Sequence, residues 1–295
     1  MTDSTYHQQM KTPDGRTLEY LVEGDPTGYP LVHHHGTPGA AIPYPAYSQA
    51  AKERGLALIQ YTRAGYGQSS PRPDRTVADV AEDVTSLLDH LGHDEFVTFG
   101  WSGGGPHSLA CAALLPGRCR AAGTGAGVAP YLADDLDFLD GMGPENHEEF
   151  GAALEGRHAL EPYLEKEAVA LTSVTAEQVG DALGGLVSPV DKAYATGEFA
   201  ARTLASFRRA CLNGVEGWAE DDLAFTRHWG FELAAITVPV SVWQGAEDRM
   251  VPFSHGKWLA ANIPGAAVHL FDDQGHLSLW GRIGDILDDL LARRT

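Results

Sequence analysis

Short apolar runs alternate with longer amphipathic stretches along the first 130 residues of the chain. The short runs have the length and composition of strands and lie at 6–11, 17–23, 30–34, 56–61, 96–99 and 120–127. The longer stretches are helix-like and lie at 44–54, 76–91 and 106–115. Strands that alternate with helices predict a mostly parallel sheet flanked by helices on both faces.

The stretch 76–91 carries the clearest helix signals. Its apolar residues fall on one face, Thr76 can cap its start, and Asp79 completes a capping box. Gly92 is suited to end the helix because glycine adopts the left-handed conformation of a C-terminal cap.

The alternation stops between residues 131 and 228. Helical patches follow one another there without strands, at 133–139, 147–154, 162–171 and 199–212. After this stretch the alternating pattern resumes, with strands at 240–243 and 267–271 and helices at 254–262 and 277–291. We therefore expect a core of residues 1–130 and 229–295, with a helical cap inserted at 131–228.

The chain is strongly acidic, with a net charge of −19 over 295 residues. This charge argues against nucleic acid as a partner, because phosphate contacts need clusters of lysine and arginine. Residues 131–228 hold 19 acidic and 7 basic side chains, a net charge of −12. The simpler interpretation is a solvated helical surface, and the sharper one is an acidic lid that repels anionic substrates.

The remaining composition points to a soluble protein of the cytoplasm. No apolar run approaches the ~20 residues that span a bilayer, and residues 1–9 lack the apolar core of a signal peptide. Cys111, Cys119 and Cys211 are odd in number and lack metal-site spacing, which suits a reducing compartment. The sequence leaves the oligomeric state open.

The sequence Gly100-Trp101-Ser102-Gly103-Gly104 reads G-x-S-x-G at the junction of a predicted strand and a predicted helix. A serine on so tight a turn has its hydroxyl exposed, and the glycines let the adjoining backbone segments approach closely. Ser102 is therefore the candidate nucleophile.

Ser102 needs a base, and the base needs an orienting acid. His276 is the candidate base because it follows the last predicted strand, where a loop lies at the carboxyl edge of the sheet. Asp248 is the candidate acid, since it directly follows the strand predicted at 240–243. Its rivals are Glu247, Asp272 and Asp273.

Two backbone amides are expected to hold the oxyanion. The amide of Gly103 lies at the helix start, and the amide of Thr37 follows the strand at 30–34. Pro38 has no N–H and cannot donate. Loss of one such donor costs about 3 kcal/mol in the barrier.

The triplet His33-His34-His35 also suggests a metal site. On a strand His33 and His35 share one face while His34 faces the other, so three ligands for one ion are not expected. We expect His35 to anchor the oxyanion loop and to border the substrate pocket together with Trp101. Cap aromatics such as Tyr131, Phe138 and Trp218 are further pocket candidates. Gly65 and Gly67 lack the rest of a phosphate-binding fingerprint and predict a packed turn.

Four motifs in this order make the chain resemble the α/β-hydrolase family, particularly its cap-bearing serine hydrolases. They are His35-Gly36-Thr37-Pro38-Gly39, Gly100 to Gly104, Asp248 before Val251-Pro252, and Gly275-His276. The resemblance implies an α/β-hydrolase fold, a Ser102–His276–Asp248 triad, an acyl-enzyme and no cofactor. It also implies a small-molecule substrate bound beneath the cap, most simply a carboxylic ester.

Alternative activities remain open at this point. The loop at 35–39 also resembles that of prolyl aminopeptidases, although those enzymes carry a tryptophan after the serine and here Trp101 precedes it. Carbon–carbon bond hydrolysis uses the same triad. A non-catalytic ligand receptor on the same scaffold is a remote alternative.

Overall fold

The computed structural model describes residues 6–294, so the first part of the polar stretch 1–9 lies outside the described residues. Eight strands within this range form one sheet in the order β1-β2-β4-β3-β5-β6-β7-β8. Their bounds are β1 Gln8–Lys11, β2 Thr17–Gly24, β3 Tyr29–His34, β4 Leu56–Thr62, β5 Phe96–Trp101, β6 Cys119–Gly125, β7 Val240–Gly245 and β8 Ala267–Phe271.

The sheet is parallel from β4 to β8 and antiparallel at its N-terminal edge. The first two predicted strands form a hairpin, in which β1 pairs with β2, and β2 pairs in turn with β4. The pairs from β3/β4 to β7/β8 are parallel. Parallel strands end at one edge of the sheet, so the loops after β3, β5, β7 and β8 lie close together there.

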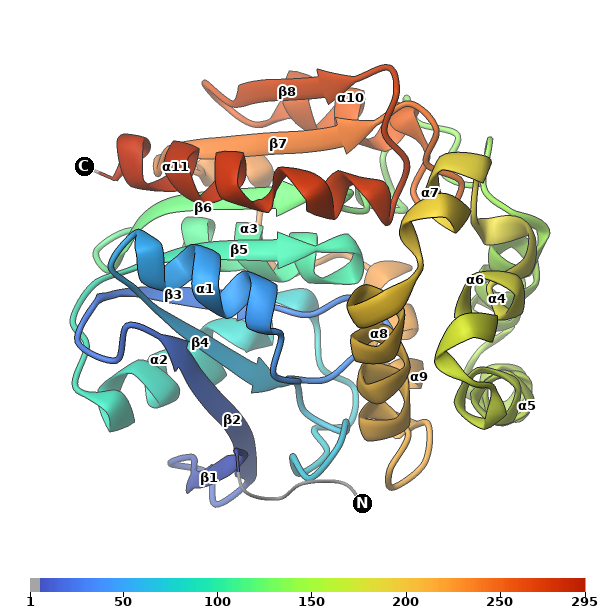
Figure 1. Cartoon of the computed structure of the whole chain (residues 1–295), viewed down its shortest axis with the longest axis horizontal. Coiled ribbons are helices and arrows are strands. Elements are labelled where there is room, and N and C mark those ends of the chain that lie inside the picture. Colours follow the sequence, from blue (N-terminus) through green and yellow to red (C-terminus); the bar gives the residue numbers. More distant parts are fainter. Residues whose placement is uncertain (1–5, 295) are drawn as a thin grey trace.

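Helices cover both faces of the sheet, as predicted (Figure 1). α1 and α11 pack together on one face, and α2 and α3 pack together on the other, where α10 covers β7. Their bounds are α1 Pro45–Glu53, α2 Val80–Leu91, α3 Gly105–Leu114, α10 Phe253–Asn262 and α11 Ile283–Arg293. Covered on both sides, β4 and β5 have no exposed residue, in agreement with their largely apolar sequence.

The helix predicted at 76–91 is present with its predicted ends. A short 3-10 turn, η1 (Val77–Asp79), leads into α2, and the Thr76–Asp79 capping box is formed. The Thr76 amide donates to Asp79 Oδ2 at 2.6 Å. Gly92 ends the helix in the left-handed conformation, with φ +76°.

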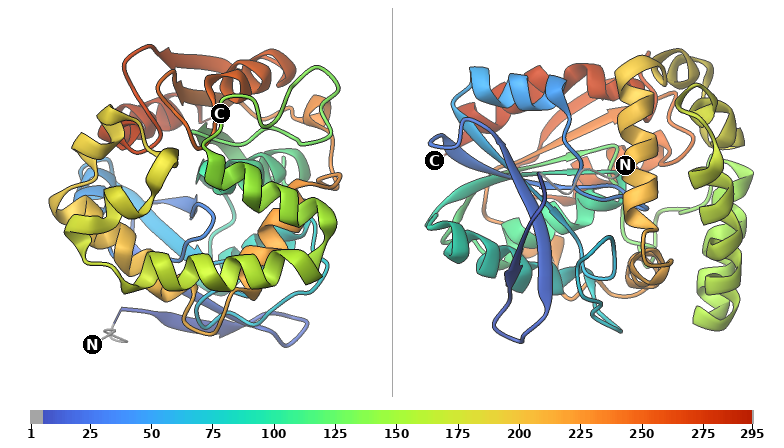
Figure 2. Two further views of the ribbon diagram at one scale, coloured as in Figure 1. Left: turned by 90° about the vertical axis from the view of Figure 1, so that its right-hand side faces the viewer. Right: turned by 60° about the horizontal axis from the view of Figure 1, so that its bottom comes forward.

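Six α-helices lie between β6 and β7, beyond the carboxyl edge of the sheet (Figure 1). They are α4 Pro144–Glu155, α5 Arg157–Ser173, α6 Val179–Ala182, α7 Pro189–Tyr194, α8 Gly197–Ala210 and α9 Glu216–Phe225. In Figure 2, left, α4 and α5 lie in front of the sheet edge. α8 and α9 contact α5 and lie nearer the core. We call residues 131–228 the helical insertion below.

The helix predicted at 133–139 is wrong, since this segment forms successive turns. Its aromatic residue explains the difference. Phe138 is buried against Tyr131, Phe150 and His255, and its carbonyl oxygen binds His255 Nε2 at 2.8 Å. Anchoring of Phe138 to the core therefore replaces helical hydrogen bonding. None of the helices described is long and apolar enough to cross a membrane.

Candidate active site

Ser102 lies at the turn between β5 and α3, in the conformation that its motif predicts. It opens the 3-10 turn η2 (Ser102–Gly104), and its φ of +54° is unusual for a residue with a side chain. A Cβ added at Gly100 would lie 2.0 Å from the Gly104 carbonyl oxygen. Glycine is thus required where the chain crosses itself below Ser102.

His276 and Asp248 lie together at the same edge of the sheet. His276 Nδ1 donates to Asp248 Oδ2 at 2.8 Å, and both side chains are buried. Asp248 also accepts from the amides of Met250 and Val251 at 2.9 and 2.8 Å and from Gln244 Nε2 at 2.9 Å. These donors hold the carboxylate, and its bond to Nδ1 leaves His276 Nε2 free to accept a proton.

The electrostatic surroundings favour protonation of His276. Burial alone lowers its pKa, but the charge and hydrogen bond of Asp248, with a contribution from Asp191, raise the pKa above the usual value of 6.5. The imidazolium that forms when the ring takes a proton is therefore stabilised.

Asp191, which the sequence analysis missed, holds the loop of His276. It lies in α7 and is fully buried. Its Oδ2 accepts from the amide of His276 at 2.9 Å, and its Oδ1 accepts from the amides of Leu277 and Ser278 at 2.8 and 2.9 Å. A carboxylate from the helical insertion thus fixes three successive amides around the candidate base.

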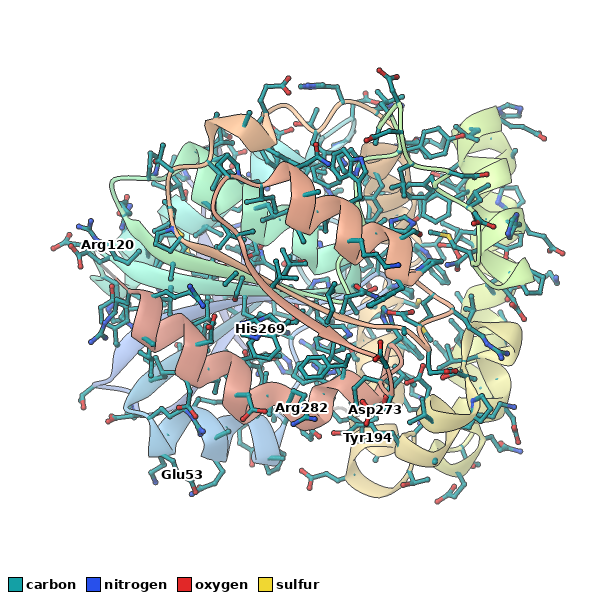
Figure 3. The ribbon with its side chains drawn as sticks, turned by 90° about the horizontal axis from the view of Figure 1, so that it is seen from above. Glu53, Arg120, Tyr194, His269, Asp273 and Arg282 are labelled. Carbon is teal, nitrogen blue, oxygen red and sulfur yellow. The ribbon has the colours of Figure 1, made fainter. Side chains whose placement is uncertain are left out.

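The three rival acids lie away from His276 Nδ1. Glu247, Asp272 and Asp273 are exposed, and Asp273 lies in the loop between β8 and η6 (Ser278–Arg282; Figure 3). These three side chains are close to Asp248 or His276 in the sequence but do not contact the imidazole, because the turns after β7 and β8 direct them toward solvent.

The loop after β3 brings Thr37 beside Gly103. A Cβ added at Gly103 would lie 2.3 Å from Thr37 Oγ1, so the two predicted oxyanion donors come from adjoining segments. The Thr37 amide donates to no protein group within residues 6–294. Arg63, in the loop after β4, donates to the carbonyl oxygens of His35 and Gly36 and fixes this loop from below.

Asp221 of α9 is the centre of a buried polar network under the same loop. Its Oδ2 accepts from the hydroxyls of Thr37 and Tyr66 at 2.6 and 2.8 Å, and its Oδ1 accepts from Arg75 Nη2 at 2.6 Å. Arg63 is a further ion-pair partner. Burial alone would raise the pKa of Asp221, but the two arginines hold it well below its usual value.

The histidine triplet is engaged in structural contacts. His34 Nδ1 lies 2.8 Å from the Tyr61 hydroxyl, and its Nε2 lies 2.9 Å from Thr98 Oγ1. His35 donates through Nδ1 to the Gly36 carbonyl at 2.7 Å and accepts from the Arg63 amide at 3.1 Å. Within residues 6–294, no group of three or more His, Cys, Asp or Glu side chains could hold a metal ion.

A cavity of about 180 Å³ lies between the sheet edge and the helical insertion. Ser102 and His276 both line it, and so do the predicted residues His35, Thr37, Trp101, Gly103 and Trp218. The other two pocket candidates, Tyr131 and Phe138, are not among the lining residues of this cavity. Their rings pack against each other, with centroids 5.0 Å apart.

One wall of the cavity carries carboxyl groups from the helical insertion, namely Glu145, Glu149, Glu167 and Asp222. Trp218 Nε1 donates to Glu149 Oε1 at 2.7 Å. Burial raises the pKa of Glu149, and burial together with Glu149 raises the pKa of Asp222 well above its usual value. Burial and the proximity of the two groups thus both favour a protonated carboxyl here.

The acidic insertion is therefore only partly a solvated surface. Asp191 is fully buried, as are the three consecutive acidic residues 220–222, which corrects the simpler interpretation of the charge. The sequence contains a signal for this burial, because the acidic residues 220–222 interrupt the apolar run between Trp218 and Phe225. Acidic side chains within an apolar helix must be paired or protonated.

The chain belongs to the α/β hydrolase fold family, whose sequence profile matches residues 29–282. It is 26% identical over 276 residues to "Uncharacterized hydrolase YcgS" of Bacillus subtilis (strain 168), covering 92% of each chain. It is 34% identical over 106 residues to a "Probable proline iminopeptidase" of Leptolyngbya boryana, covering 35% of this chain and 33% of that one. A solved "Alpha/beta hydrolase fold protein from Nakamurella multipartita" superposes with a TM-score of 0.64 at 25% identity, covering 97% and 99% of the two chains.

Proposed function

We propose that the protein is a serine hydrolase that cleaves small carboxylic esters through an acyl-enzyme. The observation that carries this proposal is the 2.8 Å hydrogen bond between His276 and Asp248 beside a cavity that Ser102 also lines. A nucleophile, a base and an orienting acid are the three groups that acyl transfer requires.

In the proposed reaction, His276 Nε2 takes the proton of Ser102 Oγ as this oxygen attacks the ester carbonyl. The amides of Gly103 and Thr37 then donate to the oxyanion. His276 returns the proton to the departing alcohol, and an acyl-enzyme remains on Ser102. Water, activated by the same imidazole, releases the carboxylic acid. Asp248 retains its charge and stabilises the imidazolium in both halves of the reaction.

In this proposal the helical insertion, residues 131–228, acts as the cap over the site. Its helices supply the Glu149 and Trp218 side chains of the cavity wall, and its Asp191 and Asp221 hold the loops of His276 and Thr37. The cap thus both encloses the substrate and orders the reacting groups.

The test is hydrolysis of short p-nitrophenyl esters by the wild type, Ser102→Ala and Ser173→Ala. Ser173 is exposed on α5, where its hydroxyl binds the Val169 carbonyl, and serves as the matched control. We expect Ser102→Ala to lose at least about 10³-fold in kcat and all labelling by a fluorophosphonate, while Ser173→Ala keeps both. Equal rates for the wild type and Ser102→Ala would refute the nucleophile.

Aminopeptidase activity is a second candidate, favoured by the carboxyl groups of the cavity wall. Glu149 and Glu167 would face a substrate ammonium, and the similarity to a probable proline iminopeptidase agrees with this possibility. Turnover of proline β-naphthylamide should then exceed ester turnover in kcat/KM, and Glu149→Gln should raise KM for the amide alone. Equal effects of Glu149→Gln on amide and ester would contradict the candidate.

A further inference from the structure

Arg202 of α8 is half-buried and differs in its contacts from the fully buried arginines of the chain. Arg63 and Arg75 pair with Asp221, and Arg209 pairs with Glu19. Within residues 6–294, Arg202 makes no ion pair and no hydrogen bond, and its Nε atom is enclosed without an acceptor. A guanidinium withdrawn from water normally needs an anion beside it.

Aromatic rings hold Arg202 in place of a carboxylate. Its guanidinium carbon lies 5.5 Å from the Tyr44 ring centroid and 5.4 Å from that of Trp280. Trp280 stacks in turn on Trp101, with centroids 4.4 Å apart, and Trp101 adjoins Ser102. Stacking stabilises the cation and fixes its plane, but it leaves the five N–H donors without partners.

Arg202 also lines the cavity that contains Ser102 and His276. Among the residues described there, it is the one arginine or lysine of the lining. His33 lines the cavity as well, and its Nε2 is buried without a partner. Burial, followed by the charge of Arg202, lowers the pKa of His33 to about 3, so this ring remains neutral and can donate one hydrogen bond.

We propose that Arg202 binds a carboxylate of the substrate, so that the preferred substrates are esters carrying a free carboxylate. This proposal rests on the proposed hydrolase function and deepens it. The fork of guanidinium donors matches a carboxylate in two parallel hydrogen bonds. A partly buried, charge-assisted pair of this kind changes affinity by about ten- to a hundredfold.

Acidic side chains of the helical insertion oppose the approach of anionic esters, and four carboxyl groups, those of Glu145, Glu149, Glu167 and Asp222, lie on the cavity wall itself. Repulsion by the outer acidic residues is exerted through solvent and is screened over about 8 Å at 0.15 M salt. Measurements at this ionic strength therefore report mainly the local contacts within the cavity, and the Arg202 variants separate the contribution of the guanidinium from that of the carboxyl groups.

The test compares acid esters with their neutral methyl counterparts. One series carries the carboxylate on the acyl side, as the mono-p-nitrophenyl esters of succinate, glutarate and adipate. The other carries it on the leaving group, as acetate and butyrate esters of 4-hydroxybenzoate. In the wild type we expect at least one acid ester to exceed its methyl counterpart in kcat/KM by about tenfold or more.

In Arg202→Met this acid-to-neutral ratio should fall by at least about tenfold, and in Arg202→Lys it should fall less, because lysine keeps the charge but not the fork. Arg208→Met is the matched control on the same helix. Arg208 is exposed and donates to the carbonyl oxygens of Thr172 and Val174, so its loss should leave the ratio unchanged.

Two outcomes would overturn the carboxylate site. One is a wild-type ratio of acid-ester to methyl-ester kcat/KM at or below one for every carboxylate position and chain length. This result does not depend on whether any variant folds. The other is a ratio that Arg202→Met leaves unchanged. If neutral esters still turn over with Ser102 dependence in these cases, the hydrolase function stands and only the carboxylate site fails.

Binding to Ser102→Ala supplies a readout that is independent of turnover. Calorimetric titration with monomethyl glutarate should give at least tenfold tighter binding than dimethyl glutarate, and Arg202→Met should abolish the difference. Equal binding of the two ligands would count against the proposal.

Discussion

Asp191 and His276 are joined by a 2.9 Å hydrogen bond between a side-chain oxygen and a backbone amide, although 85 residues separate them in the sequence. Asp191 belongs to α7 of the helical insertion, whereas His276 follows the last strand of the sheet. A Cβ added at Gly275 would lie 2.4 Å from both Asp191 oxygens, so the loop also lies directly against this carboxylate. The position of the imidazole thus depends on a residue outside the sheet.

Replacing Asp191 by Asn should reduce kcat/KM for a short ester by about 10- to 100-fold, because a displaced base loses alignment with Ser102. The charge of Asp191 contributes to the raised pKa of His276, so the acid limb of the pH–rate profile should shift to lower pH. Asp181→Asn, at an exposed residue near Lys192, is the control. A lower rate with an unshifted acid limb would mean that Asp191 acts through loop position alone.

Replacing Asp248 by Asn should lower kcat by roughly 10⁴-fold, as expected when the imidazole loses its orienting carboxylate. Met250, Val251 and Gln244 all donate to Asp248, and an Asn amide nitrogen would meet one of these donors or His276 Nδ1. Single-turnover hydrolysis measures the effect. The exposed neighbour Glu247 gives the control Glu247→Gln, and a comparable loss in that variant would contradict the assignment of the acid.

Replacing Asp221 by Asn should lower the free energy of unfolding by about 3–5 kcal/mol, because Arg63 and Arg75 would lose a fully buried counterion. Urea denaturation monitored by tryptophan fluorescence measures this change. Activity of the folded fraction should also fall, since Thr37 binds the same carboxylate. Glu161→Gln removes the charge of a partly exposed partner of Arg157 and should change stability by less than about 1 kcal/mol.

The carboxyl pair of Glu149 and Asp222 predicts a pH dependence of stability. Both pKa values are raised in the folded protein, so the stability contributed by the protonated carboxyl groups is complete below the ordinary carboxyl pKa. It is lost as the pH rises through the raised values. Relative to the wild type, Asp222→Asn should therefore gain more than about 1 kcal/mol between pH 4 and pH 8. Glu148→Gln, at an exposed neighbour, should show no such gain.

The order of elements outside the insertion could be predicted, and candidate site residues could be proposed, because their signals are local, whereas α6, α7 and α9 were missed. Ser102, Asp248 and His276 each follow a recognisable strand, and parallel topology brings strand ends together. The helix at 133–139 failed because Phe138 is held by the distant His255. Its helical spacing was a local pattern that a long-range contact overrode.

Asp191, Asp221 and Arg202 could not be assigned roles from the sequence for the same physical reason. Each acts on a segment far away in the chain, and such a contact depends on how helices of the insertion pack on the sheet edge. The sequence alone also does not distinguish the buried acidic residues of an acidic stretch from the exposed ones. The packing of the insertion is the feature that the sequence predicts least well, and the contacts of these three residues depend on it.

The buried ion pair between Arg209 and Glu19, together with the anchoring of α9 through Asp221, has a consequence for protein engineering. Exchanging residues 131–228 for the corresponding segment of a relative would be an obvious way to alter selectivity. Such a chimera would leave Glu19, Arg63 and Arg75 as unmatched interior charges unless the donor segment carried equivalent residues. The helical insertion and the sheet are therefore not interchangeable modules in this protein, and any transplant must include the charged residues that join them.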